Sequence, residues 1–329
     1  MINIVVDMMG GDDSYKITVP SVEKFAKEHK DINLYCVGTP THLTKLTGLG
    51  LPNLFIIPSK TVIKMDADPM SALKDLDSSL MVGIKTLIDN DYDAIVSAGS
   101  TGALLSASVF KIKRISGIKR PALTTSLPTT KGDKKTVVLD LGANTECSAI
   151  ELEQFAMLGS IYFSIVYSKN NPSVAQLNIG TEEEKGTSVN KEVFASLKNN
   201  ENINFIGNIE SREVLNGLAD VVICDGYSGN IFLKSTEGAI KAMSSLLKAS
   251  FKKNLLSKIS YLGVRKSLKE MKEKMNYKSV GGAILLGVNK VVVKAHGSSD
   301  EKAFYSALKL TKTLAENNIV EKIKEEIAK

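Results

Sequence analysis

The sequence has little of what several protein classes depend on. Cysteine occurs only three times among 329 residues, at Cys36, Cys147 and Cys224, with neither a CxxC pair nor a Cys/His spacing. This scarcity argues against a disulfide framework and a zinc site, and it favours a reducing cytoplasm. No run approaches 18 apolar residues, and no basic and apolar leader precedes the first expected strand. We therefore expect neither signal-directed export nor a membrane-spanning segment.

The usual catalytic signatures are also missing. The sequence has no GxGxxG motif after a strand and no GxxxxGK[ST], HExxH or GxSxG motif. Histidine occurs only at His29, His42 and His296, and the first two stand in polar contexts and are interpreted as incidental. His296 lies in a Gly/Ser loop after an expected strand, where a site role and a hydrogen-bonded structural role are both open. Because nothing points to a nucleophile–histidine–carboxylate triad, we expect the nucleophile to come from the substrate.

The net charge of +6 is concentrated in one segment. Residues 241–280 contain eleven Lys/Arg against only Glu270 and Glu273, a net charge of +9, which leaves −3 for the rest of the chain. A basic character confined to one segment argues against a general nucleic-acid-binding protein. The composition of the whole chain, with 43% hydrophobic and 24% charged residues, is that of a globular protein. We expect one catalytic unit over residues 1–329, with two intertwined subdomains as the alternative.

Short β-branched runs alternate with amphipathic helical stretches along the chain. Near-continuous apolar strands between helices predict an α/β protein whose mostly parallel sheet is covered on both faces. The expected strands are 2–6, 33–37, 53–57, 94–97, 122–126, 136–141, 174–179, 203–207, 221–224 and 291–294. The clearest expected helices are 69–88, 102–115, 146–167, 210–218, 230–251 and 300–316.

Glycine and polar residues follow six of these strands. The loops concerned are 7–12, 97–103, 140–146, 178–182, 225–230 and 295–300. In a parallel sheet the carboxyl ends of the strands lie at one edge, where ligands bind. We therefore expect the six loops to converge on one cleft. For any single loop, turn formation and helix capping are the better explanation.

A buried strand turns directly into a helix within residues 94–105. The sequence there is Ala-Ile-Val-Ser-Ala-Gly-Ser-Thr-Gly-Ala-Leu-Leu. Such a turn directs unpaired N–H groups and the positive end of the helix dipole at one point. Ser100 and Thr101 add hydroxyl groups, and Gly99 and Gly102 let a ligand approach the backbone. The pattern predicts a phosphate-binding loop.

Other polar residues in the loops are candidates with competing explanations. Lys185 can reach an anionic ligand as a point charge, although pairing with Glu182 or Glu183 explains its position better on spacing alone. Asn144 and Asn230 open helices in glycine-rich loops and can donate to an oxyanion, although each alone is explained as a helix cap.

Four aspartates follow expected strands or start their loops, at Asp7, Asp12, Asp140 and Asp225. They can form a metal site or close Asx-turns. The turns are favoured, because no metal-ligand spacing is evident.

At these positions the sequence resembles the acyl-ACP:phosphate acyltransferases, the PlsX family. Met8 and Ser100 stand where the family usually has Ala and Asn, which leaves the backbone donors of those loops intact. The shared motifs follow the family's order from residue 2 to beyond 300: Asp-x-Met-Gly-Gly-Asp (7–12), Ser-Ala-Gly-x-Thr-Gly-Ala (97–103), Asp-x-Gly-Ala-Asn (140–144), Asn-Ile-Gly-Thr-Glu-Glu-x-Lys-Gly (178–186), Cys-Asp-Gly-Tyr-x-Gly-Asn (224–230), Gly-Gly-Ala-x-Leu-Leu-Gly (281–287) and His-Gly-Ser-Ser-Asp (296–300).

The resemblance implies transfer of a fatty acyl group from the thioester of acyl carrier protein to inorganic phosphate, giving acyl phosphate for phospholipid synthesis. It also implies a three-layer αβα sandwich similar to phosphotransacetylases and the isocitrate dehydrogenase-like fold. A homodimer, peripheral on the cytoplasmic face of the membrane, is implied too, with no redox cofactor and no obligatory metal. Because phosphate is itself the nucleophile, the site must hold a dianion against a thioester carbonyl and stabilise the oxyanion.

The family's catalytic lysine and asparagine fall on Lys185 and Asn230. His296 is a further candidate for proton handling or phosphate binding. Helix N-termini at 99–102 and 142–144 are expected to bind phosphate. The expected phosphate- and substrate-binding residues are Gly10, Gly11, Gly99, Ser100, Thr101, Gly102, Gly142, Asn144 and Gly229.

The basic segment 241–280 is expected to form a protruding amphipathic helical hairpin. Its apolar tip contains Leu255 and Leu256, next to Lys252 and Lys253. An apolar tip with basic flanks suits the anionic surface of a bilayer, which is the favoured interpretation. Docking of acidic acyl carrier protein and a dimer core are the alternatives.

Two other functions stay open at this point. A phosphotransacetylase acting on a short acyl-CoA would use the same fold and phosphate site. A non-catalytic regulator that binds acyl groups or anions would bind ligand without turnover.

Overall fold

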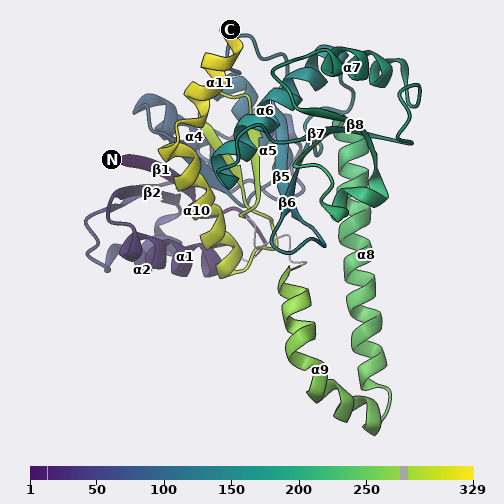
Figure 1. The fold of residues 1–329 in the computed structure, drawn as a ribbon. Helices are drawn as coiled ribbons and strands as arrows, with labels where there is room; N and C mark the ends of the chain where they lie inside the picture. Colours follow the sequence, from purple (N-terminus) through teal and green to yellow (C-terminus); the bar gives the residue numbers. More distant parts are fainter. Residues whose placement is uncertain (13, 275–280) are drawn as a thin grey trace.

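The computed structural model describes residues 1–12, 14–274 and 281–329, and an eleven-stranded sheet runs through its body (Figure 1). The strands pair in the order β3-β2-β1-β4-β11-β10-β5-β6-β9-β7-β8. Their bounds are β1 Ile2–Asp7, β2 Ile32–Gly38, β3 Leu54–Pro58, β4 Ala94–Ser97, β5 Ala122–Pro128, β6 Lys135–Leu139, β7 Val174–Asn178, β8 Phe205–Glu210, β9 Val221–Ile223, β10 Ala283–Leu286 and β11 Val291–Lys294.

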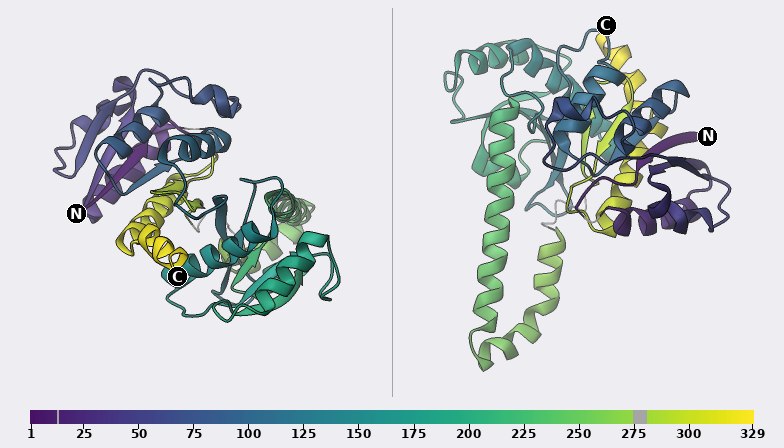
Figure 2. Two further views of the ribbon diagram at one scale, coloured as in Figure 1. Left: turned by 90° about the horizontal axis from the view of Figure 1, so that it is seen from above. Right: turned by 180° about the vertical axis from the view of Figure 1, so that it is seen from behind.

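Helices cover both faces of the sheet, which confirms the predicted αβα sandwich (Figures 1 and 2). Their bounds are α1 Tyr15–Glu28, α2 Pro40–Thr47, α3 Pro69–Ala72, α4 Ser79–Asp89, α5 Thr101–Ala107 with its π-helical continuation η1 Ser108–Ile112, α6 Ala149–Tyr167, α7 Ser188–Lys198, the 3₁₀ helix η2 Ser211–Asn216, α8 Gly226–Lys252, α9 Leu255–Lys274, α10 Glu301–Glu316 and α11 Ile319–Ile327.

Alternation along the strands assigns each side chain to one face. In β1, Ile4 and Val6 join the apolar cluster under α1, α2, α6, α7, α10 and α11, whereas Val5 joins the cluster under α4 and α5. In β9, Val222 faces a third cluster, which includes Phe232 of α8. Because successive strand residues point to opposite faces, these buried runs hold helices on both sides.

All ten expected strands are present, with ends shifted by at most three residues. The strand that the sequence did not predict is β10, which runs antiparallel between β11 and β5. It is only four residues long and lies between Gly281-Gly282 and Gly287. A β-carbon at Gly282 would lie 2.3 Å from the Lys294 carbonyl oxygen, so only glycine allows this tight turn against β11.

The sheet is not parallel throughout, and this corrects the expectation of a single ligand edge. Seven of its strand pairings are parallel, and three are antiparallel: β11–β10, β10–β5 and β5–β6. As a result, β1–β4 and β11 run in one direction and β6–β9 run in the other. The polar loops after β1, β4 and β11 therefore lie at one edge, and those after β6, β7 and β9 lie at the opposite edge.

The expected single helix over 69–88 is two helices, α3 and α4. The chain between them attaches to a neighbouring loop, because the Asp77 carbonyl accepts from the N–H groups of Lys60 (3.0 Å) and Thr61 (3.3 Å). Ser78 then caps α4 by accepting from the Met81 N–H.

One helix in the described part of the chain, α6, is long and apolar enough to span a membrane. It belongs to the core of the body instead. Phe155, Leu158 and Tyr162 are fully buried, and α6 packs against β9, α7 and α11.

Helices α8 and α9 form a hairpin that projects from the body (Figures 1 and 2). The buried residues of α8 lie in its first two turns, and α9 has none among its described side chains. Leu255 and Leu256 stand at the turn of the hairpin and are 73% and 77% exposed. The predicted protruding hairpin is present up to Lys274, and residues 275–280 of the expected segment lie outside the described residues.

Candidate active site

The loops after β1, β4 and β11 pack directly on one another. A β-carbon at Gly10 would lie 2.3 Å from the backbone nitrogen of Gly99, and one at Gly11 would lie 3.0 Å from the Gly297 carbonyl oxygen. The Asp12 N–H donates to that same carbonyl at 2.9 Å. The predicted glycines at 10, 11 and 99 therefore serve loop-to-loop packing, because any side chain would separate these backbones.

Asp7 holds this group of loops together from within. Its buried carboxylate accepts from the hydroxyls of Ser79 and Ser97, each at 2.7 Å, and from the Met9 N–H at 3.2 Å. The Ser97 hydroxyl in turn accepts from the Gly99 N–H at 3.0 Å. The contact with Met9 is the turn that the sequence favoured for this aspartate.

The loop that follows β4, residues 98–102, is named the β4 loop here and leads into a continuous helical stretch over 101–112. Ser100 caps this helix by accepting from the Ala103 N–H. Thr101 is exposed, and its N–H and that of Gly102 occupy the first turn, where no intrahelical acceptor exists. Gly102 packs against α3, because a β-carbon there would lie 2.6 Å from Pro69 Cγ. The N–H donors that the sequence predicted at this turn are present, and the Ser100 hydroxyl serves as the helix cap.

A buried lysine that the sequence did not single out lies beneath the β4 loop. Lys294, the last residue of β11, is 7% exposed, and its Nζ donates to the carbonyl oxygens of Ala98 (3.3 Å) and Ala295. Burial lowers the pKa of Lys294 to about 8. The signal was available in the sequence as a charged residue that ends the run Val291–Val293, directly before the Gly/Ser loop.

His296 lies at the same edge, in the loop after β11. Its Nδ1 contacts the N–H (3.2 Å) and the hydroxyl (3.0 Å) of Ser298. The His296 side chain is partly exposed. It therefore combines a local structural contact to Ser298 with access to solvent near the β4 loop.

The loop after β6, residues 140–144, is named the β6 loop and is built around Asp140. This carboxylate is fully buried and accepts from the N–H groups of Leu123 (2.9 Å), Gly142 (3.1 Å), Ala143 (3.0 Å) and Asn144 (2.7 Å). Burial raises the pKa of Asp140, although these hydrogen bonds act in the opposite direction.

The expectation that Gly142 and Asn144 donate to phosphate needs correction. Their N–H groups already bind Asp140, and the Asn144 amide donates to the Pro121 carbonyl and to Asp140, each at 2.8 Å. No helix starts in this loop, because α6 begins only at Ala149. An internal carboxylate thus takes the place that the sequence suggested for an external anion.

The start of α8 packs tightly on the β6 loop. A β-carbon at Gly229 would lie 1.9 Å from the Asp140 carbonyl oxygen, so glycine is required for the contact. Asn230 follows, and its side chain lies 3.5 Å from where a Gly142 β-carbon would stand. Asn230 is exposed, and its side chain makes no hydrogen bond within the described part of the chain. Its amide is therefore available to a ligand at the β6 loop.

Lys185 lies in the loop between β7 and α7. Its stem covers Gly180, where a β-carbon would lie 3.1 Å from Lys185 Cγ. The pairing with Glu182 or Glu183 is absent, because Glu183 pairs with Lys198 at 2.8 Å and no described carboxylate lies within 4 Å of the Lys185 ammonium. Lys185 is exposed and free to meet an anionic group.

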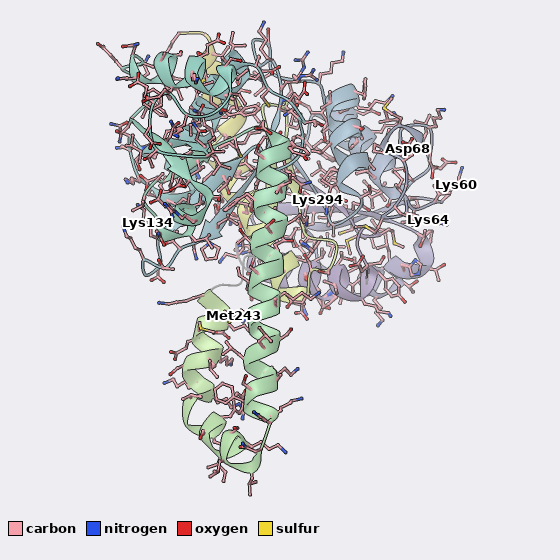
Figure 3. All side chains as sticks on the ribbon, turned by 90° about the vertical axis from the view of Figure 1, so that its right-hand side faces the viewer. Lys60, Lys64, Asp68, Lys134, Met243 and Lys294 are labelled. Carbon is pink, nitrogen blue, oxygen red and sulfur yellow. The ribbon has the colours of Figure 1, made fainter. Side chains whose placement is uncertain are left out.

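The two groups of loops meet over one face of the sheet. Leu105 of α5 and Ala143 of the β6 loop each pack against both apolar clusters of that face. Helix α8 starts at the β6 loop and passes Lys294, whose charge its Lys234 repels (Figure 3). No hydrogen bond joins the side chains of Lys185 and Asn230 within the described residues. An open cleft of about 1420 Å³ runs between their segments, with Leu177, Ile231 and Phe232 among its apolar lining.

Comparisons with known proteins identify the family. A family model described as "Fatty acid synthesis protein" matches residues 2–322. The chain belongs to this family. Its relatives include the phosphate acyltransferase of Caldicellulosiruptor saccharolyticus, which is 42% identical over 328 residues and 98% of each chain. The phosphate acyltransferase of Staphylococcus epidermidis is 40% identical over 328 residues and 99% of each chain.

Solved structures agree on the architecture. A phosphotransacetylase from Streptococcus pyogenes superposes with a TM-score of 0.63 over 96% of this chain and 94% of its own. At 16% identity this likeness shows the fold alone.

Proposed function

We propose that this chain transfers a fatty acyl group from a thioester to inorganic phosphate. The observation that carries the proposal is an identity of 40–42% to phosphate acyltransferases over nearly the whole chain. The chemistry of the described residues supports it. Burial raises the pKa of all three cysteine thiols, that of Cys147 to about 12, so none is an activated nucleophile. Phosphate then supplies the nucleophile itself.

The reaction needs no covalent enzyme intermediate. A phosphate oxygen attacks the thioester carbonyl carbon, the tetrahedral oxyanion forms, and the C–S bond breaks. The thiolate leaves and takes up a proton, and acyl phosphate remains. The protein's task is to hold phosphate against the carbonyl and to stabilise the negative charge that develops.

The catalytic roles divide between the two groups of loops. The β4 loop, with Ser100, Thr101 and Gly102, offers phosphate its helix N–H groups. Asn230 donates to the oxyanion or orients phosphate, and Lys185 neutralises charge. His296, at the β4 edge, handles the leaving proton or contacts phosphate.

A long-chain donor carried by acyl carrier protein is the favoured substrate. The cleft between the Lys185 loop and α8 exceeds the range of about 300–1,000 Å³ that is typical of small-ligand pockets. That space suits a fatty acyl chain better than an acetyl group. A phosphotransacetylase acting on short acyl-CoA is the second candidate, because a phosphotransacetylase shares the fold.

The experiment measures loss of thioester from long-chain acyl carrier protein and traps acyl phosphate with hydroxylamine. We expect hydroxamate that depends on both phosphate and enzyme. Product from acetyl-CoA alone would move the assignment to a phosphotransacetylase. Ligand binding without product from either donor would leave a non-catalytic regulator.

The hairpin is proposed to bring the enzyme, as a homodimer, to the cytoplasmic surface of an anionic membrane for phospholipid synthesis. Leu255 and Leu256 are exposed at its turn, separated from Lys252 and Lys253 by one residue. Apolar side chains beside basic ones bind the interface of anionic bilayers. Met243 marks the part of α8 that projects beyond the body (Figure 3).

Replacing Leu255 and Leu256 with Glu tests this placement. We expect the double variant to lose sedimentation with anionic liposomes, while Ile206→Glu, an exposed apolar position on β8, retains it. Undiminished sedimentation would refute membrane contact. A raised KM for acyl carrier protein, or a monomer in ultracentrifugation, would reassign the hairpin to donor docking or to the dimer.

A further inference from the structure

Lys294 is a buried charged side chain that forms no ion pair within the described residues. It ends β11 between β4 and β10, with Ala98 and Ala295 supplying only neutral carbonyl oxygens. Within residues 1–12, 14–274 and 281–329, no carboxylate lies within 4 Å of its ammonium. The nearby Asp7 has its oxygens bound to Ser79, Ser97 and Met9.

The electrostatic surroundings of Lys294 do not compensate for its burial. Asp7 and Asp12 favour the ammonium form, Lys234 on α8 opposes it, and burial outweighs all three. Taking an ammonium out of water without an ion pair is costly. A methionine of similar length would avoid that cost, but it would not donate to the Ala98 and Ala295 carbonyl oxygens.

An anion at the β4 loop would account for the charge. Lys294 binds the carbonyl of Ala98, the first residue of the β4 loop, and that loop presents the unpaired N–H groups of Thr101 and Gly102. An ammonium group has three donors, and two of those on Lys294 are used by the carbonyls. In the view of Figure 3, Lys294 is labelled next to α8, whose Lys234 acts on its charge.

We propose that Lys294 is a phosphate-binding residue that fixes the affinity of this enzyme for inorganic phosphate. The assignment rests on the proposed function and adds to it a second cation, distinct from the exposed Lys185. Lys294 supplies a buried positive charge from below the loop, and the helix N–H groups supply donors from the loop itself. Phosphate binding then neutralises the charge that the fold leaves unpaired.

The variant Lys294→Met tests the assignment, with Lys290→Met as the matched control. Lys290 belongs to the turn between β10 and β11 and pairs with Asp91 at 2.5 Å, away from the β4 loop. The first readout is the shift in Tm caused by inorganic phosphate, which reports binding without turnover. We expect the shift to disappear in Lys294→Met and to persist in Lys290→Met.

The second readout separates KM from kcat. Loss of a charge-assisted contact predicts a rise of about tenfold or more in the KM for phosphate, with the KM for the acyl donor unchanged. Without phosphate, Lys294→Met should melt at or above the temperature of the wild type, because a buried unpaired charge has been removed.

Two outcomes would overturn the proposal. A lower Tm with the phosphate shift retained would make Lys294 a structural residue that supports Ala98. An unchanged phosphate KM would exclude it from the binding site. If the wild type binds phosphate but makes no acyl phosphate, the proposed function fails and the Tm comparison still decides the role of Lys294.

Discussion

Each half of the sheet places a buried charged side chain under a loop, but the two charges have opposite sign. In the β6 loop the charge is the Asp140 carboxylate, and the N–H groups of residues 142–144 are bound to it. In the β4 loop the charge is the Lys294 ammonium, and it meets only carbonyl oxygens. The β6 loop binds its internal anion through its own N–H groups, whereas the internal carboxylate on the β4 side, Asp7, is bound by the hydroxyls of Ser79 and Ser97 and by the Met9 N–H.

This difference separates scaffolding from binding. A loop whose donors are all bound to an internal carboxylate is rigid and has nothing left to offer a ligand, so the β6 loop positions Asn230. A loop with a buried cation and free helix N–H groups is stabilised when it binds an anion. We therefore expect the halves to divide the work, with phosphate affinity on the β4 side and transition-state stabilisation on the side of Asn230 and Lys185.

The sharpest test of that division is Lys185→Ala, which should produce the largest effect. Turnover should fall by about 100-fold or more, because charge stabilisation in the transition state is lost, while the KM for phosphate changes little. Steady-state kinetics with varied phosphate measures both quantities. The control is Lys198→Ala, which removes an exposed ion pair with Glu183 and should be near neutral. Near-normal turnover would remove Lys185 from the mechanism.

The scaffolding role of the β6 loop predicts a loss of stability in Asp140→Asn. An amide NH₂ would face several N–H donors and leave at least one unpaired, which should lower the free energy of unfolding by about 3 kcal/mol. Urea denaturation measures this change. Asp225→Asn is the matched control, because Asp225 caps α8 at the surface and Asn caps equally well. A loss below 1 kcal/mol would show that the β6 loop does not depend on its internal anion.

The buried charge of Lys294 predicts a smaller effect on the free energy of unfolding, and this effect depends on pH. The pKa of Lys294 is about 8 in the native state, below its ordinary value of 10.5. Between these values the unfolded chain binds more protons, so the wild type gains stability as the pH rises. The stability advantage of Lys294→Met at pH 7 should therefore shrink by up to roughly 3 kcal/mol at pH 10.

Chemical denaturation at several pH values provides that difference. Asp7, Asp12 and Lys234, the charged groups that act on Lys294, are present in both proteins, so their contributions cancel in the difference. An advantage that does not change with pH would mean that Lys294 is not neutralised near pH 8.

Much of the fold was predictable because its signals are local. Ten strands and the alternation with helices follow from runs of β-branched residues and from helical periodicity, which need no knowledge of distant residues. Strand β10 was not predicted, because four residues between glycines are too few to show a periodic pattern. Its omission had a large consequence, since this strand and β5 reverse the direction of the second half of the sheet.

For the candidate active site too, local features were predictable and long-range contacts were not. Chain-local features were predicted correctly: the turns closed by Asp7 and Asp140, and the hairpin beyond residue 241. The use of each hydrogen-bond donor was not predictable, because Gly142 and Asn144 look in the sequence like any free helix N-terminus.

The sequence by itself determined the family, the element order and which residues stand next to the strand ends. The tertiary structure alone decided which loop already binds an internal carboxylate and which buried charge, that of Lys294, has no ion-pair partner. The reason is physical: propensity and capping act within a few residues, whereas burial and charge pairing depend on segments far apart in the chain. Lys294 lies under Ala98 only because β11 pairs with β4, a contact that no local pattern specifies.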